Sequence, residues 1–150
     1  MLAPASGTLT VDGPSLAISQ VAGATGRYSF TGTAGQTLGL GLDTLVTTPN
    51  GGYASVRVMA PDNVTTLVSC SDVGSAGNSC NLPVLPSSGT YTVVVTPGSV
   101  NTALTGNLTL SNDAAATLTP NAPVTTFVAS RVGQNARYTF SAMAGQNLSL

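Results

Sequence analysis

The chain has 150 residues and a formal net charge of −1, and it contains no Lys, Glu, His or Trp, so that four Arg and five Asp carry all of its side-chain charge. This excludes nucleic acid as an expected partner, because phosphate contacts need clustered Lys and Arg. A hydrophobic fraction of 42% argues against a disordered chain. No apolar run approaches the roughly 18 residues that suggest a membrane helix, so we expect no membrane insertion.

Alternation of apolar and polar residues predicts a series of strands along the chain. In chain order the alternating segments are 27–30, 37–42, 54–59, 91–96 and 104–110. Turn signals rich in Pro, Gly, Asn and Ser separate them, at 49–52, 61–63, 86–89 and 97–99. Spacings of about 8–12 residues between such signals are typical of sandwiches and barrels. We therefore predict an all-β fold, an antiparallel jelly-roll-like β-sandwich.

One segment of the sequence recurs. Arg27-Tyr28-Ser29-Phe30 with Ala34-Gly35-Gln36 returns 110 residues later as Arg137-Tyr138-Thr139-Phe140 with Ala144-Gly145-Gln146. A preceding match, Thr8-Leu9-Thr10 with Thr117-Leu118-Thr119, has an offset of 109, so one residue is inserted between the two matches. Recurrence at this length indicates repeated units rather than a self-contained enzyme.

The recurrence suggests four parts. Residues 1–13 are expected to be a lead-in strand or the tail of a preceding unit, and 14–112 a complete sandwich. Residues 113–116 are expected to form a linker, and 117–150 an incomplete second unit.

The opening of the second unit is rich in apolar residues that should point inward, namely Phe127, Tyr138, Phe140, Leu148 and Leu150. Two or three strands cannot bury such a set alone. We expect these residues to contact another unit or another chain, and the segment to act as possible donor strands.

The cysteines, Cys70 and Cys80, lie close together with none left over. A disulfide between them would close a short loop and stabilise the fold by about 2–3 kcal/mol, and it would suit an oxidising compartment. A redox-active pair more often has Cys-x-x-Cys spacing, and a zinc site lacks enough ligands. We favour the structural disulfide.

The order of these features resembles the bacterial pre-peptidase C-terminal domain, a jelly-roll-like β-sandwich appended to many secreted enzymes and surface proteins. The resemblance is carried by Tyr28 and Phe30, Ala34-Gly35-Gln36, the Cys pair and Gly89-Thr90-Tyr91-Thr92-Val93. It covers about residues 20–112 and restarts near 133, which implies a tandem repeat of this domain. The resemblance also implies an extracellular or cell-surface location. Residues 1–4 lack the features of a signal peptide, so any export signal is expected outside this sequence.

The chain departs from the family at one place. Members often carry an acidic motif of the Gly-Asp-x-Asp kind before the central Val strand, and some relatives use acidic residues to bind calcium. Here the equivalent segment, 50–55, reads Asn-Gly-Gly-Tyr-Ala-Ser. Calcium needs several oxygen ligands, largely carboxylates, so we predict no metal ion and no cofactor.

Catalysis is difficult to build from these residues. General acid–base catalysis draws on His, Glu, Asp, Lys, Tyr or Cys, and three of these types are absent. A Ser nucleophile would have neither His nor Lys as its base. Most of the Asp residues fall in predicted turns, where the side chain usually bonds nearby backbone. We predict no catalytic residues.

Three sets of residues have two possible interpretations. Arg27 and Arg137 are either solvated edge charges or inter-unit contacts, with Asp43 or Asp113 as partners. Gly39 and Gly41 either weaken an edge strand or allow another backbone to pack closely. Tyr53 and Tyr91 either line a carbohydrate or peptide groove or belong to the sandwich core.

These observations favour a structural role. We predict a non-catalytic repeat unit of a secreted or cell-surface bacterial protein, whose partner is itself and which assembles head-to-tail into an extracellular fibre by strand sharing. The alternative is an accessory binding or solubility module of a secreted peptidase or adhesin, for which an extracellular polymer would be the partner.

Overall fold

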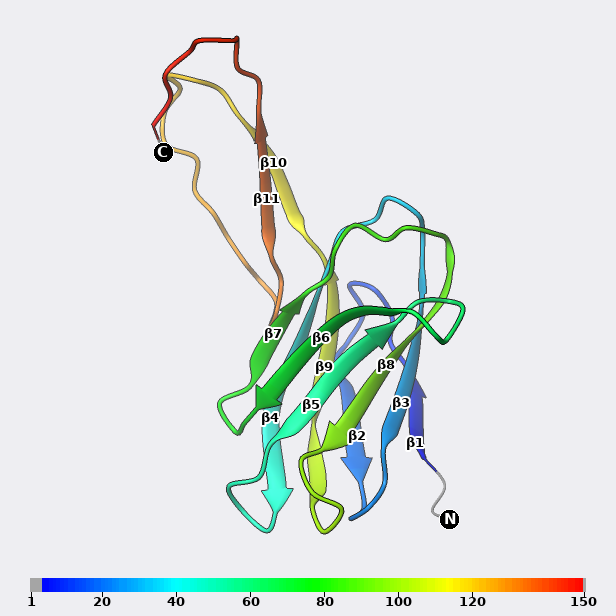
Figure 1. The fold of residues 1–150 in the computed structure, drawn as a ribbon. Helices are drawn as coiled ribbons and strands as arrows, with labels where there is room; N and C mark the ends of the chain where they lie inside the picture. Colours follow the sequence, from blue (N-terminus) through cyan, green and yellow to red (C-terminus); the bar gives the residue numbers. More distant parts are fainter. Residues whose placement is uncertain (1–3, 150) are drawn as a thin grey trace.

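The computed structural model describes residues 4–149 and shows a sandwich of two β-sheets from which a two-stranded extension projects (Figure 1). Sheet A has the order β1-β3-β8-β5-β6, from β1 (Ala5–Thr8), β3 (Gly26–Gly32), β8 (Gly89–Pro97), β5 (Ala54–Met59) and β6 (Thr66–Val73). Sheet B has the order β2-β9-β4-β7, from β2 (Leu16–Gln20), β9 (Ala103–Asn112), β4 (Leu38–Thr48) and β7 (Asn78–Asn81). The predicted all-β sandwich is confirmed.

Sheet A is mixed rather than purely antiparallel. β1 pairs in parallel with β3, while all other pairs within the two sheets of the sandwich are antiparallel. The parallel pair arises because β2, which separates β1 from β3 in the chain, lies in the opposite sheet. The chain therefore returns to sheet A in its original direction. The segment 1–13 was expected to be a lead-in strand or the tail of a preceding unit; its described part contributes β1 and the buried Leu9 to the sandwich.

The core lies between the two sheets and is filled mainly by the alternating residues of the predicted strands, together with Val73, Leu82 and Leu85 from outside them. The Phe30 and Tyr91 rings stack there with their centroids 5.3 Å apart. The other large, fully buried side chains are Tyr28, Leu38, Leu40, Leu82, Leu85, Leu104, Leu108, Leu110, Val58 and Val73. Period-2 alternation therefore identified the buried face of these strands correctly.

The predicted disulfide between Cys70 and Cys80 joins the two sheets. Cys70 lies on β6 at the edge of sheet A, and Cys80 lies on β7 at the edge of sheet B. The chain between these two edge strands turns where the Gly77 amide donates to the Gly74 carbonyl oxygen over 3.0 Å. The bond therefore links the two sheets covalently at one edge of the sandwich.

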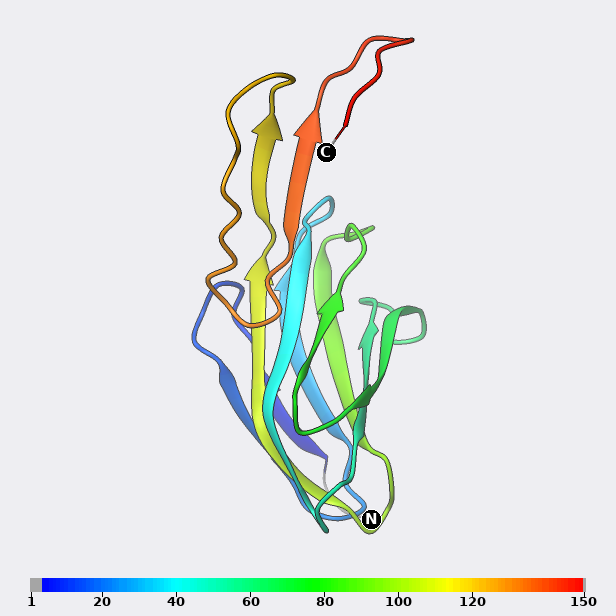
Figure 2. The same ribbon diagram turned by 90° about the vertical axis from the view of Figure 1, so that its left-hand side faces the viewer.

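The C-terminal extension, residues 114–149, projects from one end of the sandwich (Figure 2). Its two strands, β10 (Ala114–Leu118) and β11 (Ala136–Phe140), form a parallel pair. Only Asp113 separates β9 from β10, so the segment 113–116, expected to be a linker, is mostly strand.

The recurrence in sequence is accompanied by matching local geometry. β1 pairs with β3 from Ala5 opposite Gly26, and β10 pairs with β11 from Ala114 opposite Ala136, which are the positions at offsets of 109 and 110. Positive φ angles recur as well, in the pairs Asp12 and Asn121, Gly23 and Gly133, and Gly35 and Gly145. The extension thus reproduces the β1–β3 arrangement, turns included.

The extension departs from the sandwich where a partner strand is missing. Residues 123–130 correspond to the region of β2 but form no strand. In the sandwich, β2 is an edge strand whose only ladder is with β9. Within the described residues nothing equivalent to β9 follows β11, so the backbone of 123–130 has no strand to pair with.

Removing the disulfide should destabilise the sandwich without changing its topology. For a Cys70→Ser, Cys80→Ser double variant we expect the free energy of unfolding to fall by about 3 kcal/mol, the loop-entropy value for a loop of this length. Chemical denaturation of the variant and of the oxidised parent measures the difference. Equal midpoints would contradict a structural role for this bond.

Candidate functional site

The extension exposes a hollow apolar surface, which we call the open face. It is formed by Leu118, Pro123, Val124, Phe127, Tyr138, Phe140 and Leu148, around a pocket of about 460 Å³. The Phe127 and Tyr138 rings meet edge to face, with their centroids 6.4 Å apart. Of the predicted inter-unit residues, Phe127, Tyr138, Phe140 and Leu148 are brought together here. Arg27 and Arg137 do not line this surface, and Leu150 lies outside the described residues.

Two residues of the open face occupy positions that are fully buried in the sandwich. Phe140 corresponds to Phe30, and their exposed fractions are 49% and 1%. Leu148 corresponds to Leu38, with exposed fractions of 44% and 0%. An apolar patch of this kind on a protein surface marks an interaction site or an aggregation hazard. Among the described residues, the open face exposes side chains of the kind that the sandwich buries.

The edge of β11 is also incomplete. Its counterpart β3 lies between β1 and β8 in sheet A. β11 has β10 on one side, and among the described residues no strand pairs with its other side. The free edge presents unpaired backbone groups next to the open face, which is the arrangement that accepts an added strand.

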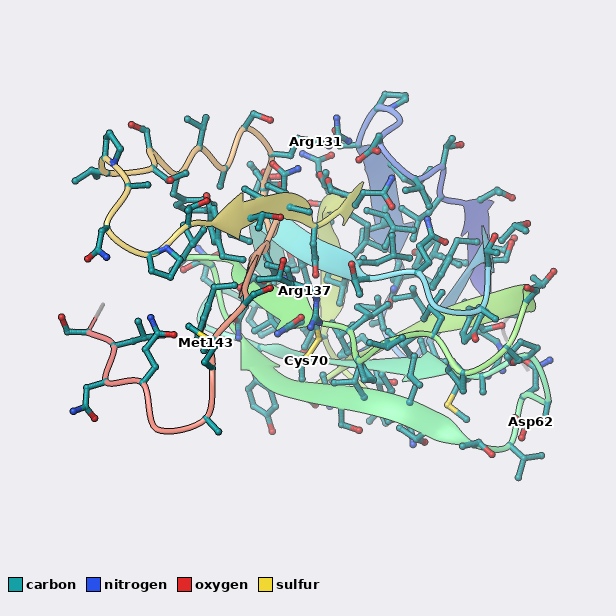
Figure 3. The ribbon with its side chains drawn as sticks, turned by 90° about the horizontal axis from the view of Figure 1, so that it is seen from above. Asp62, Cys70, Arg131, Arg137 and Met143 are labelled. Carbon is teal, nitrogen blue, oxygen red and sulfur yellow. A yellow bond between two sulfur atoms is a disulfide. The ribbon has the colours of Figure 1, made fainter. Side chains whose placement is uncertain are left out.

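A second contact surface, the joint, connects the extension to the outer face of sheet B. The loop 131–135 turns at Gly133, where the Gln134 amide donates to the Arg131 carbonyl oxygen over 3.1 Å. Arg131 Nε donates to Ser111 Oγ over 2.7 Å, and Arg131 Nη2 donates to the Gly13 carbonyl oxygen. Asn135 Nδ2 donates to Asn81 Oδ1 over 3.2 Å. Figure 3 shows Arg131 and Arg137 where the extension meets the sandwich.

The joint explains the bare outer face of β4. A Cβ atom on Gly39 would overlap the Gly133 carbonyl oxygen, and one on Gly41 would lie 2.5 Å from the Val132 carbonyl oxygen. Of the two interpretations of these glycines, close packing of another backbone is the one that the structure shows.

An ion pair stabilises the base of the extension. Arg137 Nε donates to Asp113 Oδ2 over 2.8 Å, and the Asp113 side chain is 1% exposed while that of Arg137 is 42% exposed. Asp113 was one of the two acids considered as a partner. Arg27, at the equivalent place on β3, forms no ion pair among the described residues; the position that matches Asp113 is Pro4.

The two tyrosines considered for a binding groove do not form one. Tyr91 is buried, and its hydroxyl donates to the Ser87 carbonyl oxygen over 2.6 Å, so of its two interpretations the place in the sandwich core is the one that the structure shows. Tyr53 is half-exposed and its ring lies against Gly98.

The titratable groups with shifted pKa values have structural explanations. Burial raises the pKa of Tyr28, and its hydrogen bond with Gln20 lowers it by less. Hydrogen bonds from the Thr65 hydroxyl and from the Thr65 and Val64 amides lower the pKa of Asp62, which closes an exposed turn. Asp62 lies at the opposite end of the molecule from Met143 of the extension (Figure 3). Neither group lies at the open face or the joint.

Residues 4–149 lack two features that metal or membrane binding would use. That part of the chain contains no set of three or more His, Cys, Asp or Glu side chains placed to hold a metal ion. It also contains no helix long and apolar enough to cross a membrane.

Several residues of the joint carried no recognisable signal in the sequence. Ser111, Asn81 and Asn135 are common polar residues, and nothing in their spacing indicates that they meet. Arg131 falls outside the clear part of the recurrence, since Val21 stands at the equivalent place. Arg131 is one of only four cationic residues in the chain, and this rarity was the only sequence feature that suggested a role for it.

Comparison with known proteins finds similarity in structure but not in sequence. No family model and no curated protein matches the chain. The pre-peptidase C-terminal domain of a collagenase from Bacillus anthracis aligns with a TM-score of 0.50 at 12% identity, over 73% of this chain and 98% of that one. PliG from Aeromonas hydrophila, a periplasmic inhibitor of g-type lysozyme, aligns with a TM-score of 0.47 at 18% identity, over 72% and 99%. The first likeness shows a shared fold, which is the fold that the sequence motifs suggested.

The ion pair at the base of the extension should respond asymmetrically to loss of its two partners. Arg137→Ala leaves the buried Asp113 carboxylate with only the Asn135 amide, whereas Asp113→Asn leaves an Arg137 that water can reach. We expect Arg137→Ala to raise hydrogen exchange at the Ala114 amide, which donates to the Asn135 carbonyl oxygen, by about tenfold to a hundredfold. Asp113→Asn should raise it less.

Arg27→Ala is the matched control, because Arg27 occupies the same place on β3 without an acidic partner. It should leave exchange at Ala114 unchanged. Equal effects of Arg137→Ala and Arg27→Ala would show that the ion pair does not hold the extension.

Proposed function

We propose that this chain is a non-catalytic structural unit of a secreted or cell-surface bacterial protein, built as a tandem repeat of sandwich units. Its incomplete second unit is completed by strands of a neighbouring copy, so that copies join head-to-tail into an extracellular fibre. The observation that carries the proposal is the open face, where core-type residues are exposed beside the free edge of β11.

The energetics favour completion of the open face. Burying a side chain such as Phe or Leu contributes about 1.5–3 kcal/mol, and Phe127, Phe140 and Leu148 are each about half exposed. An added strand would also pair the free backbone groups of β11. A contact between one end of a copy and a different part of the next is head-to-tail and need not close, so it produces a filament.

Secretion is supported by covalent structure and composition. The disulfide between Cys70 and Cys80 persists in an oxidising compartment. The chain also offers trypsin-like proteases only four cationic residues, all Arg.

Substitution on the open face should weaken assembly. We expect Phe140→Ser to lower the association constant of the 1–150 chain by about 10- to 100-fold, from the transfer free energy of one Phe side chain. Light scattering over a concentration series, with electron microscopy of the same samples, measures this. Val100→Ser is the matched control, since Val100 is 77% exposed in the β8–β9 loop and far from the open face in sequence.

A chain ending at Asp113 lacks the extension and should remain monomeric. The proposal is contradicted if the full chain is monomeric at every concentration, or if Phe140→Ser and Val100→Ser assemble equally well.

The alternative role, an accessory binding or solubility module of a secreted peptidase or adhesin, is supported by the fold shared with a domain of a collagenase. It predicts a monomer that co-sediments with an insoluble polymer, for which collagen fibres are the first probe. A monomer that binds collagen would replace the fibre proposal with this one.

A further inference from the structure

The contacts of the joint follow one row of residues across sheet B. Strand register places Ser111 of β9 beside Gly39 of β4, and Gly39 beside Asn81 of β7. Residues 131, 133 and 135 of the joint loop each contact one residue of this row. Arg131 bonds Ser111, the Gly133 carbonyl lies over Gly39, and Asn135 bonds Asn81.

We infer that the row Ser111–Gly39–Asn81 is a docking site for the loop of the following unit. It selects a loop with Arg, Gly and Asn at its first, third and fifth positions, and Ser149 closes the equivalent site in the second unit. The inference concerns contacts within one chain, so it does not depend on the proposed assembly between copies.

The site is built for a backbone rather than for a side chain. Ser111 points to the outer face of the sheet, where residues are usually solvated, yet it is fully buried. Thr109, which is paired with Gly41, is also buried. Because Gly39 and Gly41 have no side chains, the loop backbone can approach the sheet closely enough to cover Ser111 and Thr109.

The loop side of the contact is equally specific. The equivalent loop of the first unit, 21–25, has Val21, Gly23 and Thr25 in place of Arg131, Gly133 and Asn135. It keeps the glycine with positive φ but lacks the guanidinium and the amide that bond Ser111 and Asn81. Val21 is 59% exposed. The two loops share a turn, but only the loop 131–135 carries the polar side chains that hydrogen-bond to Ser111 and Asn81.

Ser149 stands 110 residues after Gly39, at the same place in the second unit. A Cβ atom at this position would overlap the carbonyl oxygen of a loop that docked there in the way that Gly133 docks on Gly39. The second unit therefore cannot receive a loop in this way.

Trypsin cleavage of the full chain tests the receptor side. Trypsin needs an accessible Arg on an extended backbone, and Arg131 is held by Ser111 and Gly13 while the loop is docked. Gly39→Ser introduces the residue that the second unit carries, and we expect cleavage after Arg131 to become about tenfold faster. Gly74→Ser is the matched control, since a Cβ there meets no atom within 4 Å, and it should leave the rate unchanged.

Gly39→Ser could unfold the sandwich, which cleavage after Arg27 and Arg57 would reveal. A second pair of variants therefore tests the loop side and changes no residue of the sandwich. Gly133→Ala and Gly145→Ala place the same residue at φ angles of +71° and +82°. A Cβ at 133 overlaps the Gly41 backbone, whereas a Cβ at 145 meets nothing within 4 Å. We expect only Gly133→Ala to accelerate cleavage after Arg131.

The digests are run at concentrations where light scattering reports a monomer, so that assembly between copies does not affect them. The inference is overturned if the unaltered chain is cleaved after Arg131 as fast as the Gly39→Ser variant. It is also overturned if Gly133→Ala and Gly145→Ala behave alike. Neither result would bear on whether the open face associates.

Discussion

Hydrogen bonding between neighbouring strands decides which parts of this chain form regular structure. Residues 5–112 contain every strand that the two sheets require, and they form a closed sandwich around one core. In the extension, β10 and β11 have each other as partners and form a ladder. Residues 123–130 lack a counterpart of β9 and form none. Residues 123–130 are as rich in Val, Thr and Phe as strands usually are, so we attribute the difference to the availability of partner strands rather than to strand propensity.

The extension therefore has two surfaces of opposite character. The polar groups of the joint have partners, because the loop 131–135 lies directly on Gly39 and Gly41 and bonds to sheet B. Beside it, the Asp113 carboxylate is paired with Arg137. The open face is unsatisfied, with apolar side chains exposed beside a free strand edge. Because the joint fixes how the extension leaves the sandwich, it also fixes the direction in which the open face is presented. Rigid presentation lowers the entropy lost on association.

Local pattern was enough to predict much of the fold. Period-2 alternation located β3, β4, β5, β8 and β9 with their buried faces, and the cysteine spacing identified the disulfide, but alternation did not identify β2, β6 or β7. The parallel pairing of β1 with β3 could not be predicted in this way, because it depends on β2 crossing to the other sheet. The joint was only partly visible. A close backbone approach was one of two interpretations of Gly39 and Gly41. Ser111, Asn81 and Asn135 become partners only through strand register and the path of a loop distant in sequence.

Hydrogen exchange at the backbone amides of β11, followed as protein concentration rises, tests the central claim most directly. If a neighbouring copy completes the open face, amides of residues 136–140 that do not bond to β10 exchange freely in the dilute monomer and become protected as the chain assembles. Residues 123–130 should gain protection over the same concentration range. If these amides exchange freely at every concentration, even where scattering reports large assemblies, strands are not being added to β11 and the account is wrong.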